Sequence, residues 1–285
     1  MLASIKPLQL IVAEVAADAG VALRTETLLP ASATPHNYQL RPSERRRIAE
    51  ADLLVWVGPH LERFLVKPVS LRERGAVLTV ENVNTLTFVN PDKDDGDGHG
   101  SGDHAHHQHS VDPHIWLDPA AAIEIAQAAV VELRDLDPEH SDAYMSGLQV
   151  FIARVEALDS EIGQVFSGIS HRSRFAVLHD GYSYFERRYG LAHSAAFAVS
   201  PDRSPGARHL VAMHDLMAHG GISCVIREPQ YQPQWLDHLL ADDGGRNTMR
   251  VTVLDSLAGS TSVEQGYTGF MRDFAMRLRE CLAGL

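Results

Sequence analysis

One long segment, residues 138–166, carries a single stripe of apolar side chains and predicts one uninterrupted helix. Apolar residues recur there at steps of three and four, the spacing that places them on one helix face. At about 1.5 Å of rise per residue the stripe spans roughly 33 Å, enough to connect two lobes rigidly. The alternative is an ordinary surface helix within a single domain. The stripe consists of Tyr144, Leu148, Phe151, Val155, Leu158, Ile162 and Val165.

On both sides of this segment, short apolar runs typical of strands alternate with helical patterns. Strands separated by helices pair in parallel, so we expect an α/β fold with two lobes, residues 1–137 and 168–285, joined by a helix at 138–167. Strands are predicted at residues 21–29, 53–57, 76–80, 175–178, 194–199, 224–226 and 251–254. Helices are predicted at residues 7–19, 44–51 (with Ser43 as cap), 119–136, 182–189, 207–219, 234–240 and 267–282.

The composition argues against two classes of protein. A formal charge of −12 over 285 residues does not suit a nucleic-acid surface, because phosphate binding requires clustered cations. The longest apolar runs, such as residues 53–57, are far shorter than the roughly 20 residues needed to cross a bilayer. The opening segment, MLASIKPLQL, lacks the features of a signal peptide. This leaves either a cytoplasmic protein or one whose signal peptide has been removed.

Residues 91–110 differ from everything around them. They contain five histidines, five aspartates, four glycines and almost no apolar side chains, so we expect a disordered loop. Imidazoles and carboxylates at this density favour a loose, exchangeable site for divalent transition metals. The alternative is a solvated low-complexity insert or a tag remnant. The candidate ligands of this secondary site are His99, His104, His106, His107 and His109.

Three other histidines lie in structured settings. His36 falls between a predicted strand and a helix, His114 comes just before a helix, and His179 ends a strand. Asp255 and Glu228 also follow strands, and ligands of open parallel sheets bind outside the carboxyl ends of the strands. Each residue alone is most often an ordinary loop residue. Together, three histidines and a carboxylate form a ligand set that zinc accepts in a tetrahedron.

Several strings, in the same order along nearly the whole chain, resemble one protein family. They are similar to the zinc-specific substrate-binding proteins of bacterial ABC importers, the ZnuA type, whose own acidic His-rich insert stands where residues 91–110 lie. The resemblance implies two (β/α) lobes joined by one long rigid helix, with the metal in the cleft between them. The strings are PHNYQLRPSE, ADLLVWVGPHLERFL, HIWLDP, LHDGYSYFERRYGL, REPQYQP and ECLAG.

The resemblance also assigns metal ligands. His36, His114 and His179 match the three histidine ligands of the family, and Asp255 matches the carboxylate that completes the site. Some members have a glutamate before the first histidine, where this chain has Pro35. The fourth ligand is therefore expected to be Asp255, with water or Glu228 as alternatives, and Glu228 is otherwise expected to line the cleft.

The two cysteines, Cys224 and Cys281, are compatible with one disulfide or with two buried free thiols. The family resemblance implies that they form a disulfide. That pairing requires an oxidising periplasm, so we expect a periplasmic protein whose signal peptide has been removed. Closing such a long loop would contribute about 2–4 kcal/mol to stability.

The resemblance predicts a monomeric transport component that captures Zn²⁺, its cargo, and delivers it to the membrane permease subunits of an ABC importer. A periplasmic zinc chaperone is a possible further partner. One alternative is a zinc hydrolase, since three histidines leave an open position for water. Asp180 or Glu228 would then be the base, but no HExxH motif is present. Another alternative is a metal-binding adhesin or a zinc-buffering protein on the same fold.

Overall fold

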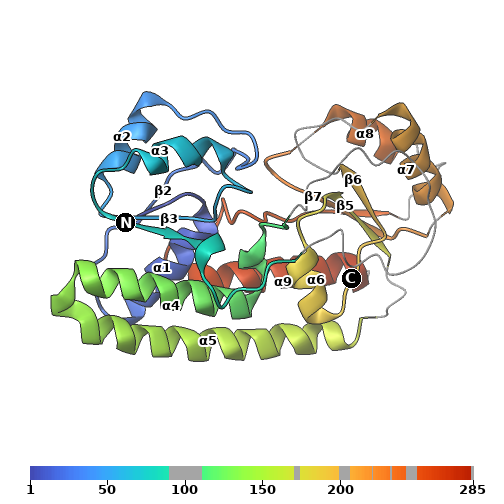
Figure 1. The fold of residues 1–285 in the computed structure, drawn as a ribbon. Coiled ribbons are helices and arrows are strands. Elements are labelled where there is room, and N and C mark those ends of the chain that lie inside the picture. Colours follow the sequence, from blue (N-terminus) through green and yellow to red (C-terminus); the bar gives the residue numbers. More distant parts are fainter. Residues whose placement is uncertain are drawn as a thin grey trace.

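The computed structural model describes residues 1–89, 111–169, 174–198, 206–219, 221–231, 233–241 and 249–283. Two four-stranded sheets lie side by side, each with every strand parallel to its neighbours. Figure 1 shows one lobe around each sheet, with a single long helix running beneath both. The predicted α/β class with two parallel-sheet lobes is therefore confirmed. The candidate His-rich site at residues 91–110 lies outside the described residues.

The N-terminal sheet contains a strand that the sequence analysis missed. β1 lies in the interior of the sheet and pairs with both β2 and β3. It is only two residues long, too short to show an alternating pattern. The neighbouring strand β2 is equally short, because its hydrogen bonds to β1 end where β1 ends. The prediction of a strand over residues 21–29 was therefore too long. In spatial order the strands are β2 (Glu26–Thr27), β1 (Leu2–Ala3), β3 (Leu53–Trp56) and β4 (Ala76–Thr79).

The C-terminal sheet matches its predicted strands within one or two residues at each end. Its central strand β5 alternates between two clusters of apolar side chains. Phe175 and Val177 belong to the large core shared with the N-terminal lobe, whereas Ala176 and Leu178 face a smaller cluster on the other side. In spatial order the strands are β6 (Ala195–Ala198), β5 (Phe175–His179), β7 (Cys224–Arg227) and β8 (Arg250–Val253).

Helices surround both sheets, and none within the described residues is both long and apolar enough to cross a membrane. The prediction that Ser43 caps α2 is wrong. The helix begins two residues earlier than predicted, at Pro42, and the backbone N–H of Arg41 donates to Glu44 at 2.7 Å. The helices are α1 (Lys6–Asp18), α2 (Pro42–Glu50), α3 (Val66–Ser70), α4 (Pro119–Leu136), α5 (Ser141–Ser167), α6 (Ser183–Tyr189), α7 (Ala207–His219), α8 (Gln234–Ala241) and α9 (Gly266–Ala283).

The long helix α5 extends over 27 residues and contacts both lobes. It packs on α1 and α4 of the N-terminal lobe and on α6 and α9 of the C-terminal lobe. The predicted stripe faces this core, except that Phe166 is buried in place of Val165. The interpretation as a connecting helix is thus confirmed over that of a surface helix within one domain. The lobe boundaries at residues 137 and 168 stay a prediction.

Helix α9 forms a second connection between the lobes. It packs on β7 and β8 and also reaches α1 and α5. The buried carboxylate of Glu14, on α1, accepts bonds from the backbone N–H (3.0 Å) and hydroxyl (2.6 Å) of Thr268 near the start of α9. Arg154 of α5 donates to the same carboxylate at 2.9 Å. Two helices and this polar junction therefore oppose rotation of one lobe against the other.

One buried carboxyl, that of Glu62, gives the fold a pH dependence. It accepts bonds from the Ser4 hydroxyl and from the backbone N–H of Gly58, the latter at 2.9 Å. Burial raises the pKa of Glu62 to about 7. Because this pKa is higher in the folded state, the protonated carboxyl adds to the free energy of unfolding. This contribution is fully present below about pH 4.5 and is lost as the pH rises through about 7.

We expect Glu62→Gln to remove the cost of burying a charged carboxylate at high pH, because glutamine stays neutral and still accepts the Gly58 N–H. At pH 8 the free energy of unfolding should rise by roughly 2–4 kcal/mol, and at pH 4.5 the gain should disappear. Urea unfolding of the metal-free proteins at both pH values measures the difference. An equal effect at both pH values would contradict the assignment.

Candidate metal centre

The three predicted histidines come from two loops and one strand end at one edge of the two sheets. His36 lies in the loop between β2 and α2, where its N–H bonds the Thr34 hydroxyl at 3.3 Å. His114 is the residue before the short 3₁₀ helix Ile115–Leu117 that leads into α4. His179 is the last residue of β5. Both lobes therefore contribute histidines to this edge.

Each histidine offers one ring nitrogen, and these nitrogens all lie within 4.8 Å of one another. The Nε2 atoms of His114 and His179 are 3.4 Å apart. An ion held about 2.1 Å from both would make an N–metal–N angle of about 110°, as in a tetrahedron. His114 and His179 are each 4% exposed, whereas His36 is half-buried. The loops thus place three nitrogen donors around one position that suits a small cation.

Two buried carboxylates hold two of the imidazole rings from behind. Asp112 Oδ1 lies 2.7 Å from His114 Nδ1 and also accepts the His114 backbone N–H at 3.0 Å. Glu228 Oε1 lies 2.7 Å from His179 Nδ1 and accepts the Tyr182 hydroxyl at 2.7 Å. A ring nitrogen that faces a carboxylate leaves the opposite nitrogen, Nε2, for a metal. Each carboxylate therefore orients a donor atom.

The sequence analysis named Glu228 as a possible cleft residue but missed Asp112 and Tyr182. Asp112 stands two residues before His114 in DPH, a spacing short enough for one side chain to reach both the ring and the backbone of the other. That spacing was the available signal. No comparable signal exists for Tyr182, because its contact depends on how β5 and β7 pair.

The electrostatics of the pocket favour a neutral His36 and an ionised Glu228. Burial, together with the neighbouring rings of His114 and His179, lowers the pKa of His36 well below its ordinary value. The neutral imidazole is the form that binds a metal. Burial alone would raise the pKa of Glu228, but His179 and the Tyr182 hydroxyl together hold it below its ordinary value. Glu228 therefore remains a carboxylate behind His179.

Asp255, the predicted fourth ligand, lies next to the pocket but not among the three histidines. Its Oδ1 accepts bonds from the side chain of Gln230 at 2.7 Å and the N–H of Leu257 at 3.1 Å, and its Oδ2 accepts the N–H of Gly259 at 2.6 Å. In the described part of the chain, the group that can hold a metal comprises the three histidines alone. The role of Asp255 as a ligand stays a prediction.

Removing the carboxylate behind a histidine should weaken zinc binding without unfolding the protein. For Asp112→Asn and Glu228→Gln we expect an affinity roughly 10- to 100-fold lower, since the donor nitrogens lose orientation and basicity. Competition against a zinc chelator measures the affinity. Glu186→Gln is the matched control, because Glu186 lies 2.9 Å from His193 in a pair outside the histidine cluster. An equal loss in the control would show that the effect is not specific to the site.

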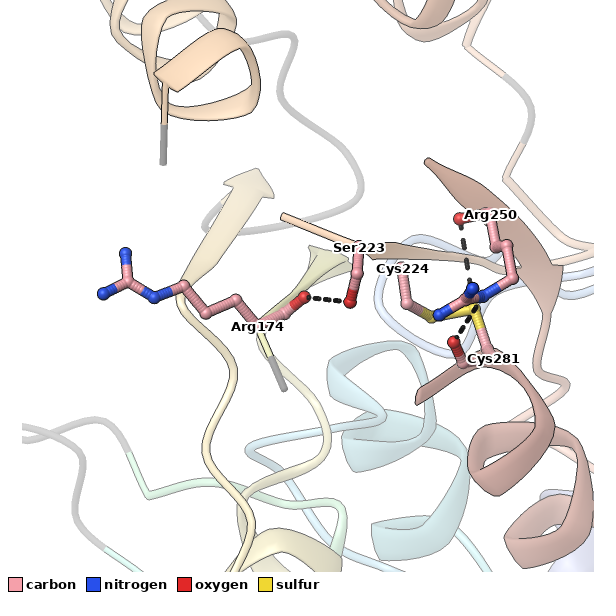
Figure 2. Close-up of a disulfide and its surroundings, with 5 residues drawn as sticks. All are labelled: Arg174, Ser223, Cys224, Arg250 and Cys281. Atoms are coloured by element: carbon pink, nitrogen blue, oxygen red, sulfur yellow. Dashed lines mark hydrogen bonds between the residues drawn. A yellow bond between two sulfur atoms is a disulfide. The ribbon is translucent and has the colours of Figure 1, made fainter. Parts of the chain in front are cut away.

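The predicted disulfide between Cys224 and Cys281 is confirmed, with Cα atoms 5.6 Å apart. Figure 2 shows that it joins β7 to the end of α9. Beside it, Arg250 Nε donates to the carbonyl of Cys281 at 2.8 Å. The bond therefore attaches the helix that reaches the N-terminal lobe to the sheet that carries Glu228.

Two parallel-sheet lobes, a long connecting helix and three histidines that meet from both lobes define a two-lobed metal-binding protein. The family model "Zinc-uptake complex component A periplasmic" (ZnuA) matches residues 1–281. The chain belongs to this family. Its members are transport components rather than enzymes, so the hydrolase alternative is excluded.

Curated relatives extend over nearly the whole chain. The high-affinity zinc uptake system protein ZnuA of Haemophilus ducreyi is 34% identical, with 99% of this chain and 93% of that protein covered. The protein of the same name from Yersinia pestis is 32% identical, with 98% and 90% covered.

Solved structures share the fold. The crystal structure of a ZnuA superposes with a TM-score of 0.79 at 24% identity, covering 98% of this chain and 97% of that one. The laminin-binding protein Lmb of Streptococcus agalactiae gives the same TM-score at 23% identity, covering 99% and 98%.

Proposed function

We propose that the protein captures one Zn²⁺ ion between its lobes and delivers it to the membrane permease subunits of an ABC importer. The convergence of three histidine nitrogens within 4.8 Å is the observation that carries this proposal. The relatives named as high-affinity zinc uptake proteins support the same metal.

The donor chemistry favours zinc over harder cations. Imidazole nitrogens bind Zn²⁺ and Cu²⁺ well, whereas Mn²⁺ and Ca²⁺ prefer oxygen ligands. The carboxylates of Asp112 and Glu228 face the rings rather than the open position between them. The ligand set is therefore mainly nitrogen, which suits a zinc carrier.

For the ligands we propose His36, His114 and His179, with Asp255 as the fourth. To bind the ion, Asp255 must exchange at least one bond to Gln230, Leu257 or Gly259 for the metal. Water is the alternative fourth ligand. Zinc titration of Asp255→Ala distinguishes the two, because only a carboxylate ligand makes retention of the ion depend on this residue.

The transport function is tested in cells that carry the cognate importer but lack this protein. Under zinc limitation, the wild-type protein should restore uptake of radioactive zinc, and a variant with His36, His114 and His179 all replaced by alanine should not. Equal restoration by both proteins would contradict the proposal. Zinc binding without restored uptake would favour a buffering protein.

The His-rich segment of residues 91–110 lies outside the described residues, and its function stays a hypothesis. We propose that it collects zinc at low affinity through His99, His104, His106, His107 and His109. Deleting residues 92–109 should lower the number of zinc ions bound per chain. An unchanged number would contradict this role.

The finer points of location and assembly are also proposals. We propose a periplasmic monomer that is loaded directly or by a periplasmic zinc chaperone. The disulfide supports an oxidising compartment. Sedimentation at several concentrations, with and without zinc, tests the monomer.

A further inference from the structure

The hydroxyl group of Tyr184 joins the two lobes next to the candidate metal centre. Tyr184 lies on α6, and its side chain is buried. The hydroxyl donates to the carbonyl of Asp112 at 2.8 Å and accepts the backbone N–H of Val89 at 2.9 Å. The N–H of Asp112 donates to the carbonyl of Val89 at 2.9 Å. The three bonds form a closed ring, in which the hydroxyl is the contribution of the C-terminal lobe.

This ring of bonds fixes the backbone of the residue that orients His114. Asp112 Oδ1 lies 2.7 Å from His114 Nδ1 and accepts the His114 N–H at 3.0 Å. The carbonyl of Asp112 is therefore held by Tyr184 while its carboxylate holds the imidazole. A carboxylate orients a metal ligand only as precisely as its own backbone is placed. The position of the His114 donor nitrogen thus depends on the Tyr184 hydroxyl.

The segment of the C-terminal lobe that carries Tyr184 also carries His179. His179 is the last residue of β5, and α6, with Tyr184 in its first turn, is the next element along the chain. This segment supplies one donor nitrogen directly and, through Asp112, places another. The Nε2 atoms of His114 and His179 lie 3.4 Å apart. Because the two histidines come from different lobes, contacts between the lobes must set this distance.

Another bond attaches the same N-terminal segment to the C-terminal lobe on the other side of His114. The indole N–H of the buried Trp116 donates to the carbonyl of Ser256 at 2.8 Å. This bond does not involve Asp112. Without the Tyr184 hydroxyl the segment should therefore stay attached at Trp116, so that the lobes remain together while Asp112 gains freedom to move.

We propose that Tyr184 is a positioning residue of the metal centre, which aligns the donor nitrogen of His114 with that of His179. It acts without being a ligand: the hydroxyl holds Asp112 across the boundary between the lobes, and Asp112 holds the ring. The inference rests on the proposed zinc site and adds to it a residue that sets the geometry of the donors.

Tyr184→Phe is the direct test, and Tyr189→Phe is its matched control. Both residues lie on α6, but the Tyr189 hydroxyl donates to Asp159 of α5 at 2.9 Å. In competition with a chelator, we expect zinc affinity to fall roughly 10-fold for Tyr184→Phe, the lower end of the range for residues that orient metal ligands. It should be unchanged for Tyr189→Phe. Wild-type affinity for Tyr184→Phe, or an equal loss in the control, would overturn the proposal.

A double-mutant cycle with Asp112→Ala separates positioning from a general loss of stability. If the hydroxyl acts through Asp112, adding Tyr184→Phe to Asp112→Ala should lower the affinity by less than about twofold further, because the carboxylate is already absent. A full additional loss of about 10-fold would overturn the route through Asp112. The visible spectrum of bound Co²⁺ should change in Tyr184→Phe and match the wild type in Tyr189→Phe.

The metal-free variant shows whether the affinity is measured on a folded protein. Tyr184→Phe leaves two buried backbone groups without the hydroxyl, so its unfolding temperature should fall by roughly 2–8 °C. Its circular dichroism at room temperature should match the wild type. A variant already unfolded at room temperature would overturn the proposal, because the bond of Trp116 is expected to hold the segment in place.

His179→Ala distinguishes failure of this inference from failure of the proposed function. If His179→Ala loses zinc but Tyr184→Phe binds like the wild type, the inference about Tyr184 is wrong and the zinc site stands. If both variants bind like the wild type, the zinc site itself is wrong.

Discussion

Replacing His114 with alanine is expected to reduce zinc affinity by roughly 100- to 1000-fold. Structural zinc sites bind with about 10–16 kcal/mol in total, so one of four ligands accounts for a few kcal/mol. The loss at His114 should also exceed that at His36, because the ring of His114 is buried and its donor nitrogen is oriented by the carboxylate of Asp112. His36 is half-buried and lies in a loop.

Equilibrium competition with a zinc chelator measures this loss, and circular dichroism confirms that the variant is folded. His60→Ala is the matched control, since His60 also pairs with a carboxylate, Glu81 at 2.8 Å, but is exposed and outside the cluster. Wild-type affinity for His114→Ala would place the zinc elsewhere in the molecule.

Removing the disulfide is expected to lower the free energy of unfolding by roughly 2–4 kcal/mol. The bond closes a loop with a sequence separation of 57 and so restricts the unfolded chain. It also holds the end of α9, the helix whose start bonds Glu14 in the other lobe. Its loss should therefore loosen the junction between the lobes as well as the C-terminal sheet.

The double variant Cys224→Ser/Cys281→Ser tests this effect by urea unfolding. Both cysteines are buried, 0% and 4% exposed, so reduction of the native protein is slow and the double variant is the better equilibrium experiment. The wild-type protein in a reducing agent should approach the same midpoint once it has been unfolded and refolded. An unchanged midpoint in the variant would show that the bond contributes nothing to stability.

Periodic features of the sequence predicted most of the fold. The stripe of α5 and the apolar runs of β3 and β5 are local patterns. A helix buried on one face shows apolar residues at helical spacing, and a strand buried on both faces shows a continuous apolar run. The strand β1 and the short helix α3 escaped notice. β1 is two residues long, so no period can be read from it, and its partners on both sides come from elsewhere in the chain.

In the candidate site, too, some residues could be predicted from the sequence and others depend on the tertiary structure. Residue types, positions next to strands and helices, and the family resemblance pointed to His36, His114 and His179, and the structure brings their nitrogens together. The carboxylates behind the rings were only partly foreseen. Asp112 is close to His114 in sequence, but Glu228 reaches His179 only because β5 and β7 are neighbours in the sheet.

Sequence alone was enough for the alternation of strands and helices, the connecting helix and the choice of the three histidines whose nitrogens converge, since these follow from local patterns and from family resemblance. It was not enough for the environment of each donor. The carboxylate of Asp255 accepts bonds from Gln230 and from two backbone N–H groups, and Gly181 lies against the Nε2 atoms of His179 and His114. These contacts join residues of different loops. The distances between those loops are set by the packing of both lobes on α5 and α9, which the sequence does not show.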